Sequence, residues 1–196
     1  NIALVDRKKR GRSQKEIEDA MREAVRKIPG TDVAVGFDRP VYVAILGNDD
    51  FLLSMIRDIA STQMIDDYVA WTVGSTRALG VKVINAGAAA AFKENVRKFS
   101  LDDVVPSYGV SSRTIVKTLQ ASVARLGIPH PLHVHCNNLG APGAADTAAA
   151  TIAASEGVPL HLAHLQFYGY GTEGKRRFSS AAARLAELVN DTPEVT

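Results

Sequence analysis

In the first 47 residues of this 196-residue chain, the pattern of apolar and polar residues predicts three strands and one helix. Residues 2–5, 33–37 and 40–46 are short apolar runs rich in β-branched side chains, which is typical of strands. Between the first two runs, apolar side chains recur at helical spacing. Ser13 followed by Glu16 is a capping box, so a helix is predicted near residues 13–28. The first 47 residues are therefore predicted to form a β-α-β-β segment.

From about residue 48 the pattern changes, and predicted helices alternate with single apolar strands. Apolar spacing and capping signals predict helices near residues 50–60, 64–79, 111–126, 144–156 and 179–190. Strands are expected at 81–85, 132–135 and 160–166, and residues 194–196 resemble the start of a further strand. This alternation is typical of βαβ units, so residues 48–196 are predicted to form a second, α/β domain with a parallel sheet.

The composition is that of an ordinary globular protein, with 46% hydrophobic and 22% charged residues. No stretch approaches the roughly 18 consecutive apolar residues of a membrane span, and the start of the chain lacks the layout of a signal peptide. The single cysteine, Cys136, excludes an internal disulfide and is compatible with a reducing compartment. We therefore expect a cytoplasmic protein without a membrane span.

Basic residues are concentrated at the start of the chain, in a pattern that can indicate nucleic acid or anionic membrane. Residues 1–30 hold nine Lys and Arg against five Asp and Glu, within a net charge of +2 for the whole chain. The run from Arg7 to Arg10 contains no interleaved aromatic residues. A solvated surface turn is favoured, and no nucleic-acid partner is expected.

Histidines give the strongest chemical signal, because all five lie between His130 and His164. His133 and His135 are two apart on a predicted strand and are expected to share a face, whereas His161 and His164 are three apart and are expected to face opposite sides. Only one of the latter two is then expected to join a common site. Parallel barrels carry their sites at the carboxyl ends of the strands, which favours His135 and His164. The residues alone leave open a metal site, hydrogen-bonded core histidines or substrate-binding histidines.

Lys82 is unusual because Val81, Val83 and Ile84 surround it in a strand that is predicted to be buried. A buried lysine is costly unless it is neutralised or paired. Three interpretations remain open: an ion pair, which is the default, a Schiff-base lysine, or a carbamate that bridges two metals.

Two glycine-containing loops follow the histidine-bearing strands and are candidates for ligand binding. The first covers residues 137–143 and the second residues 168–174, and neither matches a dinucleotide or Walker A fingerprint. Each is also compatible with a plain strand-to-helix turn. A Cys136–His135 nucleophile pair is disfavoured, because adjacent strand residues face opposite sides.

Four strings resemble the A subunit of formylmethanofuran dehydrogenase, most closely its bacterial form in formyltransferase/hydrolase complexes. They are DYVAW at 67–71, GVKVINAG at 80–87, PLHVHCNNLGAPG at 131–143 and HLAHLQF at 161–167. The resemblance extends over about 44–196. It implies part of an amidohydrolase-type (β/α) barrel with parallel strands, acting on N-formyl amines in one-carbon metabolism.

The same resemblance implies a site with one or two zinc ions. It implies Lys82, as a carbamate, His135 and His164 as metal ligands, with His133 competing with His135. Substrate-binding candidates in the two loops and the string before the second are Asn137, Asn138, Gln166, Tyr168 and Tyr170. The implied partners are the other subunits of such a complex and a small formyl-amine substrate.

This sequence departs from the family pattern in several places. No His-x-His pair precedes Lys82, and no last-strand aspartate follows. Tyr168 and Gly169 stand where His-Ser is expected, and Ala144 where Asn is usual. The chain is therefore expected to be inactive alone, and it is expected either to hold metal in an incomplete site or to hold none.

Residues 1–47 resemble a different family, the periplasmic porter domain of resistance-nodulation-division efflux pumps. The resemblance rests on residues 13–22, 27–33 and 39–47. It implies a possible chimera with a junction near residues 41–50. A porter-domain fragment of an efflux transporter, and an engineered fold without activity, are the alternatives to the hydrolase fragment.

Overall fold

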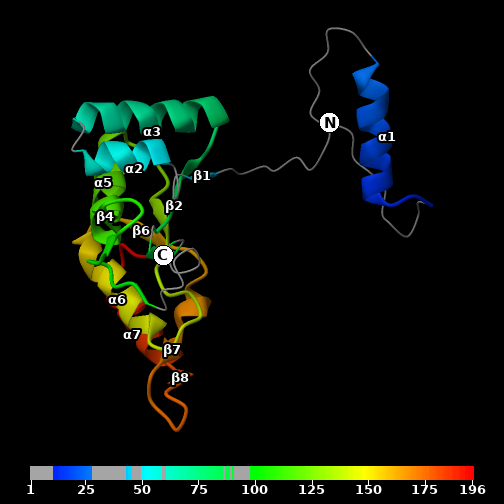
Figure 1. Cartoon of the computed structure of the whole chain (residues 1–196). Helices are drawn as coiled ribbons and strands as arrows, with labels where there is room; N and C mark the ends of the chain where they lie inside the picture. Colours follow the sequence, from blue (N-terminus) through cyan, green and yellow to red (C-terminus); the bar gives the residue numbers. More distant parts are fainter. Residues whose placement is uncertain are drawn as a thin grey trace. The chain divides into compact units, whose positions relative to one another are not determined.

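The computed structural model describes residues 11–27, 43–45, 50–58, 61–85, 87–88, 90 and 98–196. The chain divides into two compact units, Asn1–Pro40 and Val41–Thr196, and both are drawn in Figure 1. The strands predicted at 2–5 and 33–37 lie outside the described residues.

In the first unit, helix α1 covers Gln14–Arg26, as the apolar spacing predicts. The backbone N–H of Ser13 donates to Glu16 Oε2 at 2.6 Å, and the N–H of Glu16 donates to Ser13 Oγ at 3.2 Å. The two residues thus form the predicted capping box, which satisfies two N–H groups that the helix itself leaves unpaired.

The second unit is built on a four-stranded parallel sheet. Its strands are β1 (Val43–Ile45), β2 (Gly80–Ile84), β5 (Leu132–His135) and β6 (Leu160–Leu162), in the order β1-β2-β5-β6. Val195 forms a further parallel bridge to Leu160, and the further strand predicted to begin at 194–196 is present only as this isolated bridge. The parallel α/β prediction is confirmed for this unit.

The predicted boundary near residue 47 needs correction. Residues of β1 pair with β2, with Val43 opposite Gly80 and Ile45 opposite Lys82. Because β1 is an edge strand of the second unit's sheet, it cannot serve as the last strand of a separate β-α-β-β segment. The chain divides instead between Pro40 and Val41.

One face of this sheet is packed into the core. The side chains on that face are at most 3% exposed; they are Val81, Val83, Leu132, Val134, Leu160 and Leu162. The opposite face is partly exposed, and it carries Lys82, Ile84, His133, His135 and His161. Because successive side chains of a strand point to opposite faces, the sheet has one buried apolar face and one partly exposed face with the lysine and the histidines.

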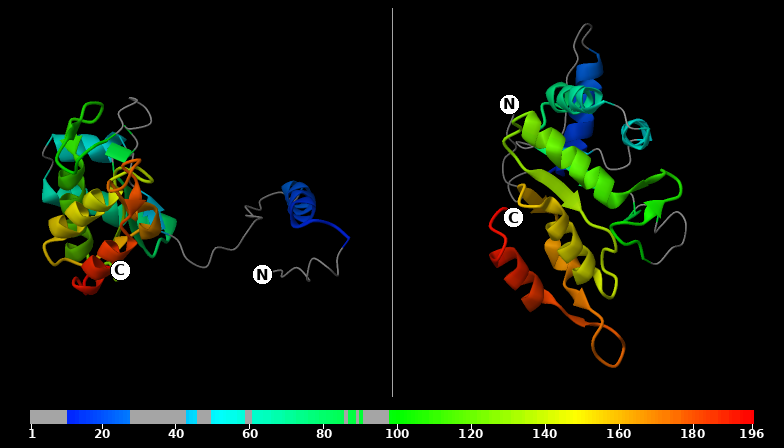
Figure 2. Two further views of the ribbon diagram at one scale, coloured as in Figure 1. Left: turned by 90° about the horizontal axis from the view of Figure 1, so that it is seen from below. Right: turned by 90° about the vertical axis from the view of Figure 1, so that its left-hand side faces the viewer.

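Helices cover the apolar face. They are α3 (Thr62–Thr76), α5 (Ser112–Arg125) and α6 (Ala144–Ser155). Helix α2 (Asp50–Arg57) packs on α3 and α5, and α7 (Ala182–Asn190) packs on α6. Figures 1 and 2 show α2 and α3 side by side at one end of the unit and α6 and α7 toward the other. Helix α6 packs closely because its buried side chains include Ala144, Ala145 and Ala148, whose small size lets the helix approach its neighbours.

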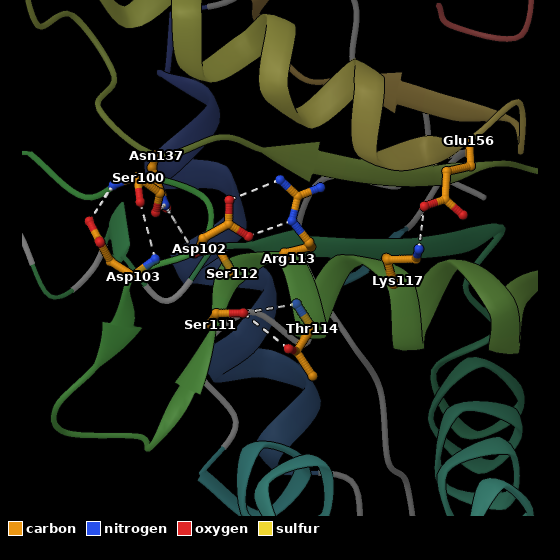
Figure 3. A network of polar contacts seen from close by, with 10 residues as sticks. All are labelled: Ser100, Asp102, Asp103, Ser111, Ser112, Arg113, Thr114, Lys117, Asn137 and Glu156. Carbon is orange, nitrogen blue, oxygen red and sulfur yellow. Dashed lines mark hydrogen bonds and ion pairs between the residues drawn. The ribbon is translucent and has the colours of Figure 1, made fainter.

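Helix α5 shows how local sequence signals fix the element that supports the central strand β5. The side chain of Ser111 caps it by accepting the N–H of Thr114 at 3.2 Å, as Figure 3 shows. Ile115, Val116 and Leu119 are fully buried against the sheet. Gly127 follows the helix with a φ of 62°, a conformation that favours glycine.

Several short elements were not predicted. Strands β3 (Val104–Val105) and β4 (Val110–Ser111) form a hairpin, as do β7 (Tyr170–Gly171) and β8 (Ser179–Ser180). The strand predicted at 160–166 is wrong beyond Leu162, since the chain turns there into a 3-10 helix, η2 (Leu165–Tyr168). Because β6 ends at Leu162, the position of His164 is set by the turn that follows the strand.

Candidate functional site

Three side chains form a row across neighbouring strands on the partly exposed face of the sheet. The strand register places Lys82 of β2 opposite His133 of β5, and His133 opposite His161 of β6. Parallel pairing brings residues at equal height onto the same face. The structure thus puts Lys82 and His133 on adjacent strands and at one level.

His135 and His164 form a pair one step closer to the carboxyl ends of the strands. His135 Nδ1 lies 2.8 Å from His164 Nε2, and their rings are arranged edge to face at 4.9 Å. His164 has a left-handed backbone with a φ of 45°, just after the end of β6. The convergence of His135 and His164 that their positions at the strand ends predicted is present.

The expected separation of His161 and His164 is wrong. His161 stacks beside His133 with ring centroids 4.2 Å apart, whereas His164 meets His135, which shares a face with His133. Opposite faces would require a regular strand that continues to residue 166. Because β6 ends at Leu162 and His164 is left-handed, both histidines reach the same side.

A second histidine cluster contains His130, His133 and His161. His133 Nε2 lies 2.9 Å from His130 Nδ1, and His161 Nδ1 lies 3.1 Å from Thr196 Oγ1. A Cβ at Gly80 would come within 3.0 Å of His130 Cβ, so the glycine leaves room for this ring. The prediction did not include His130 or His161 in a site, although the clustering of all five histidines was its signal.

Burial and neighbouring positive charge keep these imidazoles neutral. Burial lowers the pKa of His133 to about 4, and the charges of His161, His130 and Lys82 add to this effect. Burial, with the charges of His164 and Lys82, lowers the pKa of His135 to about 4 as well. The pKa of His164 is also lowered, first by burial and then by Lys82. At neutral pH, His133, His135 and His164 therefore present uncharged nitrogens, the form in which histidine binds metals.

Lys82 itself is partly exposed, because it alternates with Val81 and Val83 on the open face of β2. The expectation of a buried lysine was wrong for this reason. Within the described residues, no carboxylate forms a salt bridge with Lys82. The default interpretation as an ion pair therefore receives no support.

The described residues supply close pairs of histidine nitrogens but no larger group of metal ligands. In the part of the chain that the structure describes, no three His, Cys, Asp or Glu side chains are grouped so as to hold a metal ion. His135 and His164 are the pair whose nitrogens approach each other near the strand ends. A lysine becomes a candidate for a third ligand only after conversion to a carbamate.

The two asparagines predicted to bind substrate hold the loop after β5. Asn137 is fully buried and donates from Nδ2 to Ser112 Oγ at 3.0 Å and to the carbonyl of Ser100 at 3.2 Å. Figure 3 shows Asn137 between these two residues. Asn138 donates to the carbonyl of Phe99 and to Thr147 Oγ1. In this arrangement Asn137 has no exposed surface with which to contact a substrate.

The aromatic candidates take different places. Tyr168 is fully buried and donates its hydroxyl to the carbonyl of Cys136 at 2.8 Å, and its ring lies 6.2 Å from that of His135. Burial raises the pKa of Tyr168, so the phenol stays protonated. Tyr170 stacks with Phe178 at 4.8 Å, and Gln166 is exposed. Tyr168 thus packs beside His135, and its hydroxyl is already engaged with the carbonyl of Cys136.

Cys136 and Asn85 lie outside the histidine face. Cys136 is fully buried and burial raises its pKa to about 12, which agrees with the rejection of a Cys-His nucleophile pair. Asn85 directly follows β2 and is fully buried, and within the described ranges its side-chain amide has no hydrogen-bond partner. No feature of the sequence singled out Asn85 beforehand.

Two curated proteins match about four fifths of the chain. The A subunit of the formyltransferase/hydrolase complex Fhc of Methylorubrum extorquens is 49% identical over 159 residues, covering 79% of this chain. Protein FwdA of Methanocaldococcus jannaschii is 32% identical over 162 residues, covering 77% of this chain. This chain is homologous to part of these proteins. It spans less than a third of their length, 29% and 28% respectively.

A solved structure agrees with the sequence comparison. The crystal structure of the FhcABCD complex of Methylorubrum extorquens with methylofuran matches 79% of this chain with a TM-score of 0.72 and 50% identity. The match covers 29% of that chain. The resemblance stated for about 44–196 is therefore confirmed.

Other expectations stay without support. No family model matches the chain, and nothing found supports the resemblance of residues 1–47 to efflux-pump porter domains. None of the helices in the described ranges is both long and apolar enough to cross a membrane.

Proposed function

We propose that residues of the second unit form part of a hydrolase that acts on N-formyl amines, and that Lys82, His135 and His164 contribute to its zinc centre. The observation that carries the proposal is the pairing of His135 and His164 on the sheet face that also carries Lys82. Homology to one subunit of a formyltransferase/hydrolase complex supplies the reaction class.

The histidine pair fits a zinc ion. Zinc binds histidine nitrogen at about 2.0–2.1 Å in a tetrahedral arrangement, which puts two ligand atoms roughly 3.3 Å apart. The 2.8 Å between His135 Nδ1 and His164 Nε2 requires only a small adjustment to reach this span. Their lowered pKa values favour the neutral imidazoles that ligation requires, and in the zinc-bound form each of these two nitrogens would carry the lone pair while the other ring nitrogen keeps the proton.

Zinc at this position would act as a Lewis acid on the formyl group and activate water. The chain's own residues would prepare the site. The ring of Tyr168 lies beside His135, and its hydroxyl donates a hydrogen bond to the carbonyl of Cys136. This bond would hold the Tyr168 ring in place next to the imidazole of His135. Lys82 would bind a second ion as a carbamate, or else present a positive charge to an anionic product such as formate.

The sheet is proposed to be one part of a (β/α) barrel. In such a barrel, helices cover the outside of the parallel strands, and the opposite faces of the strands line the interior. The described sheet has this division, with helices over its apolar face and the histidines on the other. In this proposal the histidine-bearing face lines the barrel's interior, at the carboxyl ends where such enzymes carry their sites.

We further propose that the chain's partners are a formyl-amine substrate and the other subunits of an Fhc-type complex. The related protein is part of FhcABCD, and that complex was solved with methylofuran. Both properties belong to that protein and are carried over here only as proposals.

A segment exchange tests the function. In the A subunit of the Methylorubrum extorquens complex, the 159 aligned residues are replaced by those of this chain, and formate release from the complex is measured. We expect activity within about tenfold of the parent complex. Assembly of an intact complex without activity would contradict the proposal.

Single substitutions in the exchanged segment separate the site from general stability. Lys82→Met, His135→Asn and His164→Asn are each expected to reduce formate release at least 100-fold, because each removes a proposed ligand. His164→Asn is preferred to His164→Ala because asparagine tolerates the left-handed backbone at this position. His130→Asn serves as the matched control and is expected to retain activity.

A further inference from the structure

A cavity with three cationic side chains has no histidine in its lining. It has a volume of about 510 Å³ and is lined by Lys98, Ala141, Pro142, Thr172, Arg176 and Arg177. Half of these six side chains carry a positive charge. Small-molecule sites are usually concave and largely apolar, with a few polar or charged groups that fix the orientation of the ligand.

These cations have no carboxylate partner within the described residues. None of the ion pairs found there includes Lys98, Arg176 or Arg177. The neighbouring carboxylates are already engaged: Asp146 pairs with Arg184 at 2.6 Å, and Glu173 accepts a hydrogen bond from Ser179 at 2.5 Å. Among the described residues, no carboxylate therefore forms an ion pair with these three cations.

The start of helix α6 adds to the same field. The helix begins after Gly143, which has a φ of 81° and provides no side-chain cap. A Cβ at Gly143 would lie 3.5 Å from Lys98 Nζ and 3.2 Å from Thr172 Cγ2, so the glycine leaves the lysine and threonine room to approach the helix terminus. The positive end of the helix dipole thus lies beside the lysine ammonium.

The cavity is built by the loops that follow the two histidine-bearing strands. Ala141 and Pro142 come from the loop after β5, and Thr172 and the two arginines from the segment after β6. The N–H of Gly140 donates to the carbonyl of Phe167 at 3.0 Å, which fastens these segments to each other. The cavity therefore has a defined frame and is more than a run of charges on one loop.

We infer that this cavity binds an anion with two or more negative charges, carried by carboxylate or phosphate groups. Two arginines provide planar forks suited to both groups, and the lysine adds a point charge. The ligand is a free anion of this kind. This inference does not depend on the proposed hydrolase function.

Calorimetric titration of the 196-residue chain with pyrophosphate and with citrate tests the inference. Acetate and chloride at matched ionic strength control for charge screening. We expect saturable binding of pyrophosphate and citrate and none of acetate. Loss of the signal at matched ionic strength would overturn the inference.

Variants separate the cavity from general positive charge. Arg176→Ala and Lys98→Gln are each expected to weaken binding at least tenfold. Arg177→Asn, which suits the left-handed backbone of Arg177, is expected to do the same. Lys175→Ala removes a charge from the same loop without touching the cavity lining and is expected to change affinity less than twofold. An equal loss with Lys175→Ala would refute the site.

His164→Asn separates the anion cavity from the histidine pair. The variant is expected to leave binding of pyrophosphate unchanged, because the anion cavity does not include the histidine pair. Loss of pyrophosphate binding in this variant would place the anion at the histidines and overturn the inference.

Discussion

His135 Nδ1 lies 2.8 Å from His164 Nε2, although the two residues are 29 positions apart. The pair forms because β5 ends at His135 and because His164 turns left-handed just after β6. In a regular strand, His164 would project to the opposite face. An interruption of regular structure thus creates the contact on which the proposed metal site depends.

The histidines predict a specific pH dependence of stability in the metal-free chain. The pKa values of His133 and His135 are about 4 in the fold, below the 6.5 of an unperturbed histidine. Between these values the unfolded chain binds more protons, so the free energy of unfolding falls as the pH is lowered from 6.5 to 4. We expect a loss of roughly 1 kcal/mol per histidine, reduced by solvent screening, in urea titrations with a chelator present.

The double variant His133→Asn/His135→Asn is the control for this pH effect. Its free energy of unfolding is expected to change much less between pH 6.5 and 4.5. Carboxylates such as Asp66, whose pKa is lowered chiefly by hydrogen bonds from Arg125, lose their contribution only near and below pH 4. An unchanged slope in the double variant would contradict the assignment.

The ion pair between Asp66 and Arg125 is predicted to stabilise the packing of α3 on α5. Arg125 donates to both carboxylate oxygens of Asp66 at 2.8 Å, and Asp66 is only 8% exposed. Arg125→Ala would leave a buried carboxylate without its main donor, at a cost of about 1–3 kcal/mol. Thermal or urea unfolding measures this loss.

Arg113→Ala is the matched comparison. Arg113 makes a similar two-pronged contact with Asp102, visible in Figure 3, but the Asp102 side chain is 66% exposed. A solvated pair contributes less than about 1 kcal/mol. Equal losses for the two arginine variants would show that burial of Asp66 does not set the effect.

The sequence was sufficient for elements whose signals are local. The capping box of α1, the Ser111 cap and the apolar face of α5 all appear where side-chain chemistry and spacing place them. The strands β2 and β5 were also predictable, because each is a short run with alternating apolar residues between two segments with helical spacing, which is typical of a βαβ unit.

The features that could not be predicted depend on where a strand stops and on which strands pair. Spacing alone gave His161 and His164 opposite faces, because it contains no information on the end of β6 at Leu162. The burial of Asn137 and Tyr168 depends on partners 25 and 32 positions away in sequence. Such long-range contacts hold Asn137 and Tyr168 in place, and the spacing of apolar residues along the sequence cannot predict them.

We predict that the 196-residue chain alone releases formate from an N-formyl amine at no useful rate, even with excess zinc. A binuclear centre needs more ligands than Lys82, His135 and His164, and the described residues offer no group of three suitable His, Cys, Asp or Glu side chains. The histidine face is also partly exposed to water, which weakens electrostatic stabilisation of a transition state. Formate is measured with an enzymatic endpoint assay.

The Lys82→Ala variant shows whether any formate release by the parent chain comes from the proposed site. A substantial rate in the parent chain that Lys82→Ala abolishes would refute the prediction of inactivity. A rate that the substitution leaves unchanged would identify a contaminating enzyme or free zinc as its source.

The most direct measurement of the proposed metal site is the zinc content of the chain after equilibrium dialysis, determined by elemental analysis for the parent and three variants. We predict about one zinc ion per parent chain, an affinity at least tenfold lower in His135→Asn and in His164→Asn, and parent-like binding in His130→Asn. Zinc binding that survives both His135→Asn and His164→Asn, or a parent chain that binds none, would contradict the claim that these two histidines form the core of a metal site.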